Sequence, residues 1–151
     1  MRNVTDSGLD LLIEFEGFRS KAYRDVAGIW TIGYGTIRIH GRPVRPTDVC
    51  TQQEARRFMV EDLRRFCEAV DAVLPADATQ DQFNALVVMA YNIGVGGFKS
   101  STIYRKLQSR TPLTESNFTV WNKSRVDGEL VVVPGLTRRR LAEYRLYNSG
   151  T

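Results

Sequence analysis

Hydrophobic residues recur at helical spacing in several separate stretches of the chain. Leu9, Leu12 and Ile13 form the first such stripe, which has the spacing of one face of an α-helix. The stripe runs to Glu16, and Gly17 follows it as a common type of helix terminator. We therefore predict a first helix that ends at Glu16.

A different pattern, of short β-prone runs separated by glycines, occupies residues 23–44. The runs at 30–32 and 36–39 predict a small hairpin or meander. A second hairpin is predicted near the C-terminus, where the turn pair Asp127-Gly128 lies between two more β-prone runs.

The longest helical pattern begins at a capping box, in which Thr51 is followed three residues later by Glu54. Behind it, apolar residues keep the helical rhythm until Pro75 stops it. We predict one long helix over about 51–74, with a length of about 35 Å at the standard helical rise.

A second capping box, Thr79 with Gln82, opens a stretch at 83–93 that is apolar almost all round. A helix of this kind is buried, so we predict the central helix of a second lobe, ended by the glycine-rich run 94–97. Shorter helical patterns follow at 101–108, 114–121 and 137–147.

These elements predict an α+β fold that is predominantly helical and has two lobes within a single domain over 1–151. The N-terminal lobe, at about 15–60, contains the first hairpin. The helix over 51–74 connects it to a helical C-terminal lobe at about 75–151, near which we expect the first helix to pack. A polymer would lie in a cleft between the lobes.

Length and composition fit an ordinary globular domain. The chain has 151 residues, of which 42% are hydrophobic and 25% charged, enough to bury a core without metals or disulfides. Its apolar runs fall far short of the roughly 20 residues that cross a bilayer, and residues 1–18 lack the apolar run of a signal peptide. We expect a chain that is made and initially retained in a cytoplasm, with no stable membrane association.

The cysteines and the single histidine match no familiar metal site. Cys50, Cys67 and His40 do not have zinc-ligand spacings. If the predicted long helix separates the cysteines, they lie roughly 25 Å apart, beyond the reach of a disulfide. We expect two reduced, partly buried thiols and no metal or other cofactor.

The chain carries a formal net charge of +4, and its basic residues gather near the C-terminus at Arg138, Arg139, Arg140 and Arg145. A basic surface favours an anionic polymer, either nucleic acid or an acidic cell wall, although a solvated helix face explains the cluster equally well. Nucleic-acid readers interleave aromatic with basic residues or carry a known motif. This cluster does neither, so we predict no nucleic-acid partner.

Glu16 has the most informative position among the candidate catalytic residues. It lies on the core-facing stripe and at the C-terminal end of the first predicted helix, where burial and the negative end of the helix dipole both disfavour a charged carboxylate. A carboxylic acid that stays protonated is what a general acid at a glycosidic oxygen needs. Two structural alternatives stay open: the side chain reaches solvent, or it pairs with a C-terminal arginine.

Asp25 and Thr31 are ordinary residues when each is taken alone. Asp25 lies in a turn, where Asp commonly hydrogen-bonds its own backbone, and Thr31 lies in a β-prone run, where Thr is a good strand former. Near an acid, however, a second carboxylate and a hydroxyl are groups that position a water for attack.

The spacing of these three residues resembles the catalytic pattern of the phage-type lysozymes, glycoside hydrolase family 24. In that family a Glu-Gly pair is followed by an Asp nine residues after the Glu and by a Thr fifteen residues after it, in a Thr-Ile-Gly strand. Glu16, Asp25 and Thr31 match both the residue types and the spacings. The resemblance continues through four further blocks: 83–86, 90–98, 101–102 and 135–140. It therefore covers nearly the whole chain.

This resemblance implies a lysozyme-like fold and an endolysin that hydrolyses the β-1,4 bond between N-acetylmuramic acid and N-acetylglucosamine in peptidoglycan, causing host lysis. Glu16 would protonate the leaving oxygen while Asp25 and Thr31 hold water on the opposite face, which inverts the anomeric carbon. Inversion needs carboxyl groups about 6.5 to 9.5 Å apart, against roughly 5 to 5.5 Å for retention. The family also places an arginine beside the catalytic Glu, and we select Arg139 for that position.

For substrate contacts, the resemblance points to five residues: Ile37, Tyr91, Asn92, Ser101 and Arg139. Aromatic and amide side chains suit sugar faces and N-acetyl groups, although Tyr91 on a core helix also suits plain packing. The resemblance further implies a monomer that acts on the wall in the periplasm. A chain without an export signal needs a holin lesion to get there, unless an N-terminal anchor has been lost or a virion delivers it.

Thr36 departs from the family pattern. Many members have a His after Gly-Tyr-Gly, where this chain has Thr36. That His is not one of the three catalytic residues, so the difference puts a structural polar contact in doubt rather than the activity.

Two alternative functions remain beside hydrolysis. A lytic transglycosylase would use the same Glu16 but leave an anhydro sugar, and the match at Asp25 and Thr31 argues against it. A binding module would hold nucleic acid through 137–145, or the cell wall, without turnover.

Overall fold

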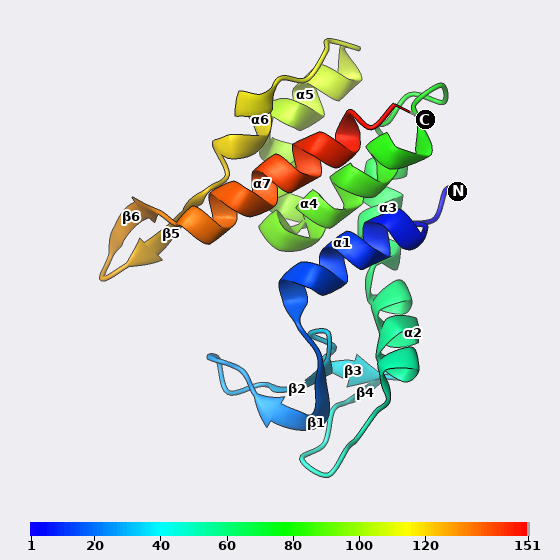
Figure 1. The fold of residues 1–151 in the computed structure, drawn as a ribbon, viewed down its shortest axis with the longest axis vertical. Helices are drawn as coiled ribbons and strands as arrows, with labels where there is room; N and C mark the ends of the chain where they lie inside the picture. Colours follow the sequence, from blue (N-terminus) through cyan, green and yellow to red (C-terminus); the bar gives the residue numbers. More distant parts are fainter. Residues whose placement is uncertain (151) are drawn as a thin grey trace. The chain divides into compact units, whose positions relative to one another are not determined.

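The computed structural model describes residues 1–150 (Figure 1). Its helices and strands are, in chain order, α1 (Asp6–Glu16), β1 (Arg19–Arg24), β2 (Trp30–Gly33), β3 (Arg38–Ile39), β4 (Arg42–Pro43), α2 (Gln52–Asp62), α3 (Arg64–Asp71), α4 (Gln80–Ser100), α5 (Thr102–Gln108), α6 (Glu115–Thr119), β5 (Lys123–Val126), β6 (Glu129–Val132) and α7 (Pro134–Tyr147). Helices dominate and the strand pairs are short and antiparallel, which confirms the predicted α+β class. The chain divides into two compact units, 9–64 and 1–8 together with the chain from 65 onward.

In the unit of residues 9–64, β1 is held along both of its edges. β2 pairs with it antiparallel and places Thr31 opposite Tyr23. On the other edge, residues 20–22 exchange backbone hydrogen bonds of 2.9 and 3.1 Å with residues 48–50. The predicted small meander is confirmed, although its first strand begins earlier than predicted, at Arg19.

The helices α2 and α3 correct the prediction of one continuous helix over 51–74. α2 does begin at the predicted capping box, where the Thr51 hydroxyl accepts from the Glu54 N–H (3.1 Å) and the Glu54 carboxylate accepts from the Thr51 N–H (3.0 Å). It ends at Asp62, and Leu63 separates it from α3. Leu63 keeps near-helical backbone angles and a fully buried side chain. The apolar rhythm therefore runs through the break, so the sequence pattern does not reveal it.

α4 forms the core of the second unit. Residues 83–90 are all fully buried, as predicted for a helix that is apolar all round, and α7 lies beside α4 (Figure 1). Gly94 interrupts α4 with a φ of +88°, in a region of backbone conformation that favours glycine. The prediction that the glycine run 94–97 ends the helix is therefore wrong, because only Gly94 departs from helical geometry and α4 continues to Ser100.

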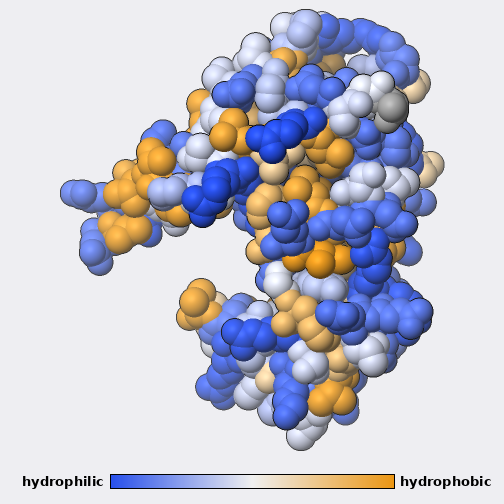
Figure 2. Space-filling view, in the orientation of Figure 1, coloured by the Kyte–Doolittle hydropathy of each residue, from blue (hydrophilic) through white to orange (hydrophobic). Residues whose placement is uncertain are grey.

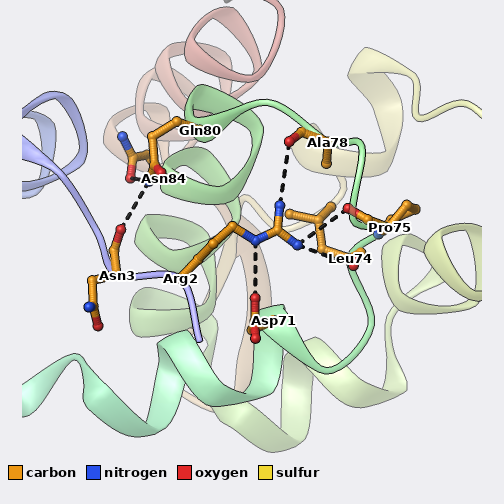
Figure 3. A network of polar contacts seen from close by, with 8 residues as sticks. All are labelled: Arg2, Asn3, Asp71, Leu74, Pro75, Ala78, Gln80 and Asn84. Atoms are coloured by element: carbon orange, nitrogen blue, oxygen red, sulfur yellow. Dashed lines mark hydrogen bonds and ion pairs between the residues drawn. The ribbon is translucent and has the colours of Figure 1, made fainter.

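The N-terminal segment is fastened to this second unit by Arg2 (Figure 3). The Arg2 guanidinium donates to the Asp71 carboxylate at 3.0 Å and lowers the pKa of that carboxyl group. It also donates to the backbone carbonyls of Leu74, Pro75 and Ala78 at 3.3 to 3.4 Å. One side chain therefore fixes the segment that leads into α1.

The strands β5 and β6 form the hairpin predicted at Asp127-Gly128. Both turn residues have a positive φ, of +51° and +84°, which is the geometry of a type I′ turn. Every residue of the two strands is exposed, and Figure 2 shows hydrophobic and hydrophilic side chains next to one another on this arm.

Cys50 and Cys67 are buried free thiols, as predicted. Burial raises the pKa of both thiols, which keeps them protonated and weakly nucleophilic.

Within residues 1–150, no helix combines the length and apolar character needed to span a bilayer.

Candidate active site

Glu16 occupies the last position of α1. The same helix carries the buried residues Leu9 and Leu12, and the Glu16 side chain is half-buried. Gly17 then adopts a φ of +71° and donates its N–H to the carbonyl of Ile13 (3.2 Å), which closes the helix and turns the chain toward β1. A carboxyl group is thereby held at a rigid helix end.

Asp25 lies in the loop that joins β1 to β2. Its Oδ1 accepts hydrogen bonds from the N–H groups of Ala27 and Ile29, both at 2.9 Å, as expected of an Asp in a turn. The backbone closes the same loop, because the Asp25 N–H donates to the Ile29 carbonyl (3.0 Å). These bonds fix one carboxylate oxygen, and with it the direction in which the second oxygen, Oδ2, points.

Thr31 lies in β2 and is only 3% exposed. Its hydroxyl donates to the carbonyl of Ile29 at 2.9 Å, so the hydrogen is engaged and the oxygen keeps lone pairs with which to accept. Ile29 therefore bonds to both predicted residues, through its N–H to Asp25 and through its carbonyl to Thr31. The two side chains are thus each bonded to the backbone of the same residue.

Glu16, Asp25 and Thr31 all belong to the compact unit of residues 9–64. This unit supplies a carboxyl group from a helix end, a carboxylate from a loop and a hydroxyl from a strand. Such a set can protonate one atom while the carboxylate takes a proton from a water that the hydroxyl orients. The arrangement is chemically suited to acid–base hydrolysis.

The residues predicted to contact substrate are distributed over both units. Ile37 belongs to the unit of residues 9–64, and the other four belong to the second unit: Tyr91, Asn92, Ser101 and Arg139. Ile37 is 44% exposed and Asn92 is also exposed. Tyr91 is half-buried, and its ring lies 5.3 Å from that of Phe66 in an edge-on arrangement. Ile37 and Asn92 are thus open to a ligand, while Tyr91 has a packing role as well.

Ser101 is buried and caps α5. Its hydroxyl donates to the carbonyl of Phe98 (2.6 Å) and accepts from the N–H of Tyr104 (3.1 Å). Both bonds are local, and a serine before a helical pattern is a typical N-cap. The structure therefore gives Ser101 a structural role that the sequence could have indicated.

Arg139 lies in a buried ionic cluster with Arg140 and Glu143 on α7. Arg140 and Glu143 are fully buried, and Arg140 Nη2 donates to Glu143 Oε2 at 2.7 Å. Arg139 Nε lies 3.6 Å from the same oxygen. Burial raises the pKa of Glu143 to about 7, although the two guanidiniums act to lower it, and burial also lowers the pKa of Arg140. The sequence analysis missed Glu143, and the signal for it was its i+3 and i+4 spacing to the two arginines.

A surface cavity of about 360 Å³ in the second unit contains none of the predicted site residues. Its cationic side chains already have partners, because Arg110 pairs with Asp77 (3.0 Å) and Lys106 donates to Asn117 (3.0 Å). This cavity is therefore not the candidate active site.

Comparison with known proteins matches most of the chain to a family. A family model described as phage lysozyme matches residues 13–143. The endolysin of Bacillus phage PZA is 40% identical over 151 residues, covering 98% of this chain and 56% of that protein. The endolysin of Acyrthosiphon pisum secondary endosymbiont phage 1 is 34% identical over 148 residues, covering 97% of this chain and 99% of that protein.

The fold is also similar to that of a solved endolysin. The structure of an endolysin from Escherichia coli O157:H7 phage FAHEc1 superposes with a TM-score of 0.89 at 36% identity, covering 100% of this chain and 96% of that one. The chain spans about half the length of the Bacillus phage relatives that it matches.

Proposed function

Because the chain belongs to the phage lysozyme family, we propose that it is an endolysin that hydrolyses the β-1,4 bond between N-acetylmuramic acid and N-acetylglucosamine in bacterial peptidoglycan and so lyses the host cell. One observation carries this proposal. The Ile29 backbone bonds to both Asp25 and Thr31, and these residues belong to the same unit as Glu16. These bonds support a role for Asp25 and Thr31 in handling a water molecule.

Glu16 acts as the general acid. Its carboxyl group donates a proton to the oxygen of the leaving sugar as the glycosidic C–O bond breaks. Its place at the end of α1 gives the side chain a fixed origin. The positive charge that develops at the anomeric carbon is then open to attack from the face opposite the leaving group.

Asp25 and Thr31 manage the attacking water. The Thr31 hydroxyl gives its hydrogen to the Ile29 carbonyl, so its oxygen accepts a hydrogen bond from the water. Asp25 takes the other water proton as general base through Oδ2, because the loop occupies Oδ1. The water oxygen bonds to the anomeric carbon, and the configuration inverts.

The proposal retains the five substrate-contact residues: Ile37, Tyr91, Asn92, Ser101 and Arg139. Ile37 offers an exposed apolar surface to a sugar face, and Asn92 offers an exposed amide to an N-acetyl group. Ser101 acts through the cap of α5, and Arg139 acts from the buried cluster in which it lies close to Glu143. The pairing of Arg139 with Glu16 stays a prediction.

The released fragments test the reaction type. A muramidase leaves reducing muramic acid ends on digested peptidoglycan, whereas a lytic transglycosylase leaves anhydro-muramyl ends. We expect mass spectrometry to find reducing ends, and a product with anhydro ends would contradict hydrolysis. Proton NMR of the first product tests the stereochemistry, because inversion of a β bond gives the α anomer first.

We also propose that the enzyme works as a monomer without a cofactor, and that it stays in the host cytoplasm until a holin lesion opens the way to the wall. Cells that express the chain should keep their turbidity until chloroform permeabilises the inner membrane. Lysis before that treatment would contradict the proposed route, and light scattering would test the monomer.

A further inference from the structure

A partly buried hydrogen bond joins the turn after β2 to the end of α2, within the unit of residues 9–64. Thr36 Oγ1 donates to Asp62 Oδ2 at 2.7 Å, and Thr36 is only 1% exposed. Thr36, which stands where many family members have His, therefore does make a polar contact in this unit.

Thr36 is linked to the strand that carries Thr31 by two more hydrogen bonds. The Ile32 N–H donates to the Thr36 carbonyl, and the Thr36 N–H donates to the Ile32 carbonyl, each at 2.9 Å. Ile32 follows Thr31 directly and is fully buried. A short series of hydrogen bonds thus runs from Asp62 to the residue beside the Thr31 hydroxyl.

Asp62 breaks a local rule of helix stability. It is the last residue of α2, whose final turn contains no basic residue, although the negative end of a helix dipole favours cations. A half-buried carboxylate at this position is costly unless it accepts hydrogen bonds. Because residues that break local rules are often retained for function, the bond from Thr36 supplies a reason for an acid here.

α2 also approaches the same strand at a second point. A Cβ placed on Gly33 would lie 2.9 Å from the Cβ of Ala55, and Gly33 has a φ of +66°. Only glycine permits this approach without strain. β2 and the turn after it are therefore held against one helix at two places, Gly33 by close packing on Ala55 and Thr36 by its hydrogen bond to Asp62.

We propose that Thr36 and Asp62 are positioning residues, whose hydrogen bond fixes β2 on α2 and so places the Thr31 hydroxyl for the attacking water. The inference rests on the proposed function, because that function gives Thr31 its role in water attack. A misplacement of about 1 Å at a catalytic group costs up to about a hundredfold in rate. Loss of the bond therefore lowers kcat and leaves KM nearly unchanged.

The variant Thr36→Val tests this, because it removes the hydroxyl with little change in shape, and Thr36→Ser is its matched control. At a temperature well below each unfolding transition, Thr36→Val should lower kcat on solubilised glycan strands about tenfold with KM within about twofold. Thr36→Ser should stay near the wild-type value. An unchanged kcat in Thr36→Val overturns the proposal, and if that variant does not fold, Asp62→Ala is judged by the same criterion.

A readout that does not use activity separates this inference from the proposed function. With labelled threonine methyl groups, the NMR order parameter of the Thr31 methyl should fall in Thr36→Val and be restored in Thr36→Ser. An unchanged order parameter overturns the positioning role even if the wild type is inactive on peptidoglycan. If the wild type is active and Thr36→Val keeps the full kcat, the positioning role is wrong while the proposed function stands.

Discussion

At the scale of single residues, Asp25 performs two tasks with two different oxygens. Oδ1 accepts from the N–H groups of Ala27 and Ile29 and so shapes the loop, while Oδ2 serves as the proposed base. The loop needs only a hydrogen-bond acceptor, whereas the chemistry needs a negative charge. The two tasks can therefore be separated by substitution.

Asp25→Asn should abolish peptidoglycan hydrolysis while leaving thermal stability nearly unchanged, because the amide oxygen still accepts the loop hydrogen bonds. Asp25→Ala should lose the same activity and also lower the free energy of unfolding by about 1 kcal/mol, through loss of those bonds. Activity assays beside thermal denaturation check both. Full activity in Asp25→Asn would remove Asp25 from the base role.

Gly17 and Gly33 give a second comparison at this scale. Both have a positive φ, +71° and +66°, but only Gly33 faces a close neighbour. Gly17→Ala should destabilise by about 1 kcal/mol through backbone strain alone. Gly33→Ala should cost about 1–3 kcal/mol more, because the new methyl overlaps Ala55. Equal losses in denaturant titrations would contradict the close approach of β2 to α2.

The residue types of the proposed site could be predicted from sequence, but their connection could not. Glu16, Asp25 and Thr31 could be identified because the family pattern is defined by side-chain types at fixed spacings. The role of Ile29 could not be predicted, because it acts through its backbone N–H and carbonyl, which nearly every residue has. The bond between Thr36 and Asp62 was also hidden, since only the fold brings these two positions together.

At the scale of elements, the buried cluster on α7 is the least expected feature. Arg139, Arg140 and Glu143 place two guanidiniums and one carboxylate in the interior. Removing charges from water costs free energy that their attraction only partly offsets, so a buried ion pair is weak support for stability. The cluster should nevertheless be sensitive to the loss of one partner alone.

Glu143→Ala should lower the free energy of unfolding by about 3–5 kcal/mol, because it leaves the buried guanidinium of Arg140 without this carboxylate. The double variant Arg140→Met with Glu143→Leu should stay much closer to the wild type, since apolar side chains replace the pair. Chemical denaturation measures both. A double variant as unstable as Glu143→Ala would show that the pair itself stabilises the fold.

The raised pKa of Glu143 predicts a pH dependence of stability. Its pKa is about 7 in the folded state against an ordinary value of 4.5, so between these values the folded state binds more protons than the unfolded state. The contribution of this group to stability is complete below about pH 4.5 and is lost as pH rises to about 7. The difference in unfolding free energy between wild type and Glu143→Gln should follow this trend. A difference that does not change over this range would contradict it.

Most elements were predicted within a few residues, and the errors have physical causes. The break at Leu63 was missed because a buried leucine with near-helical angles preserves the apolar rhythm. α7 begins at Pro134, three residues before the predicted start at 137, because proline is well suited to the first helical position. The arginines near the C-terminus were predicted to form either a basic binding surface or a solvated helix face, but Arg139 and Arg140 are buried, which is rare for charged residues.

In the whole molecule, catalysis and most substrate contacts are proposed for different parts of the chain. The three proposed catalytic residues lie in the unit of residues 9–64, and four of the five proposed contact residues lie in the other unit. The central claim is that a single carboxyl group, that of Glu16, supplies the proton for glycosidic cleavage.

Clearing of a purified peptidoglycan suspension by Glu16→Gln tests this claim most directly. The amide keeps the shape of the side chain but cannot act as an acid, so the account predicts a loss of rate of at least about a hundredfold, with an unchanged thermal transition. Glu14→Gln is the matched control, because Glu14 is exposed on the same helix, and it should clear at the wild-type rate. Undiminished clearing by folded Glu16→Gln would contradict the account.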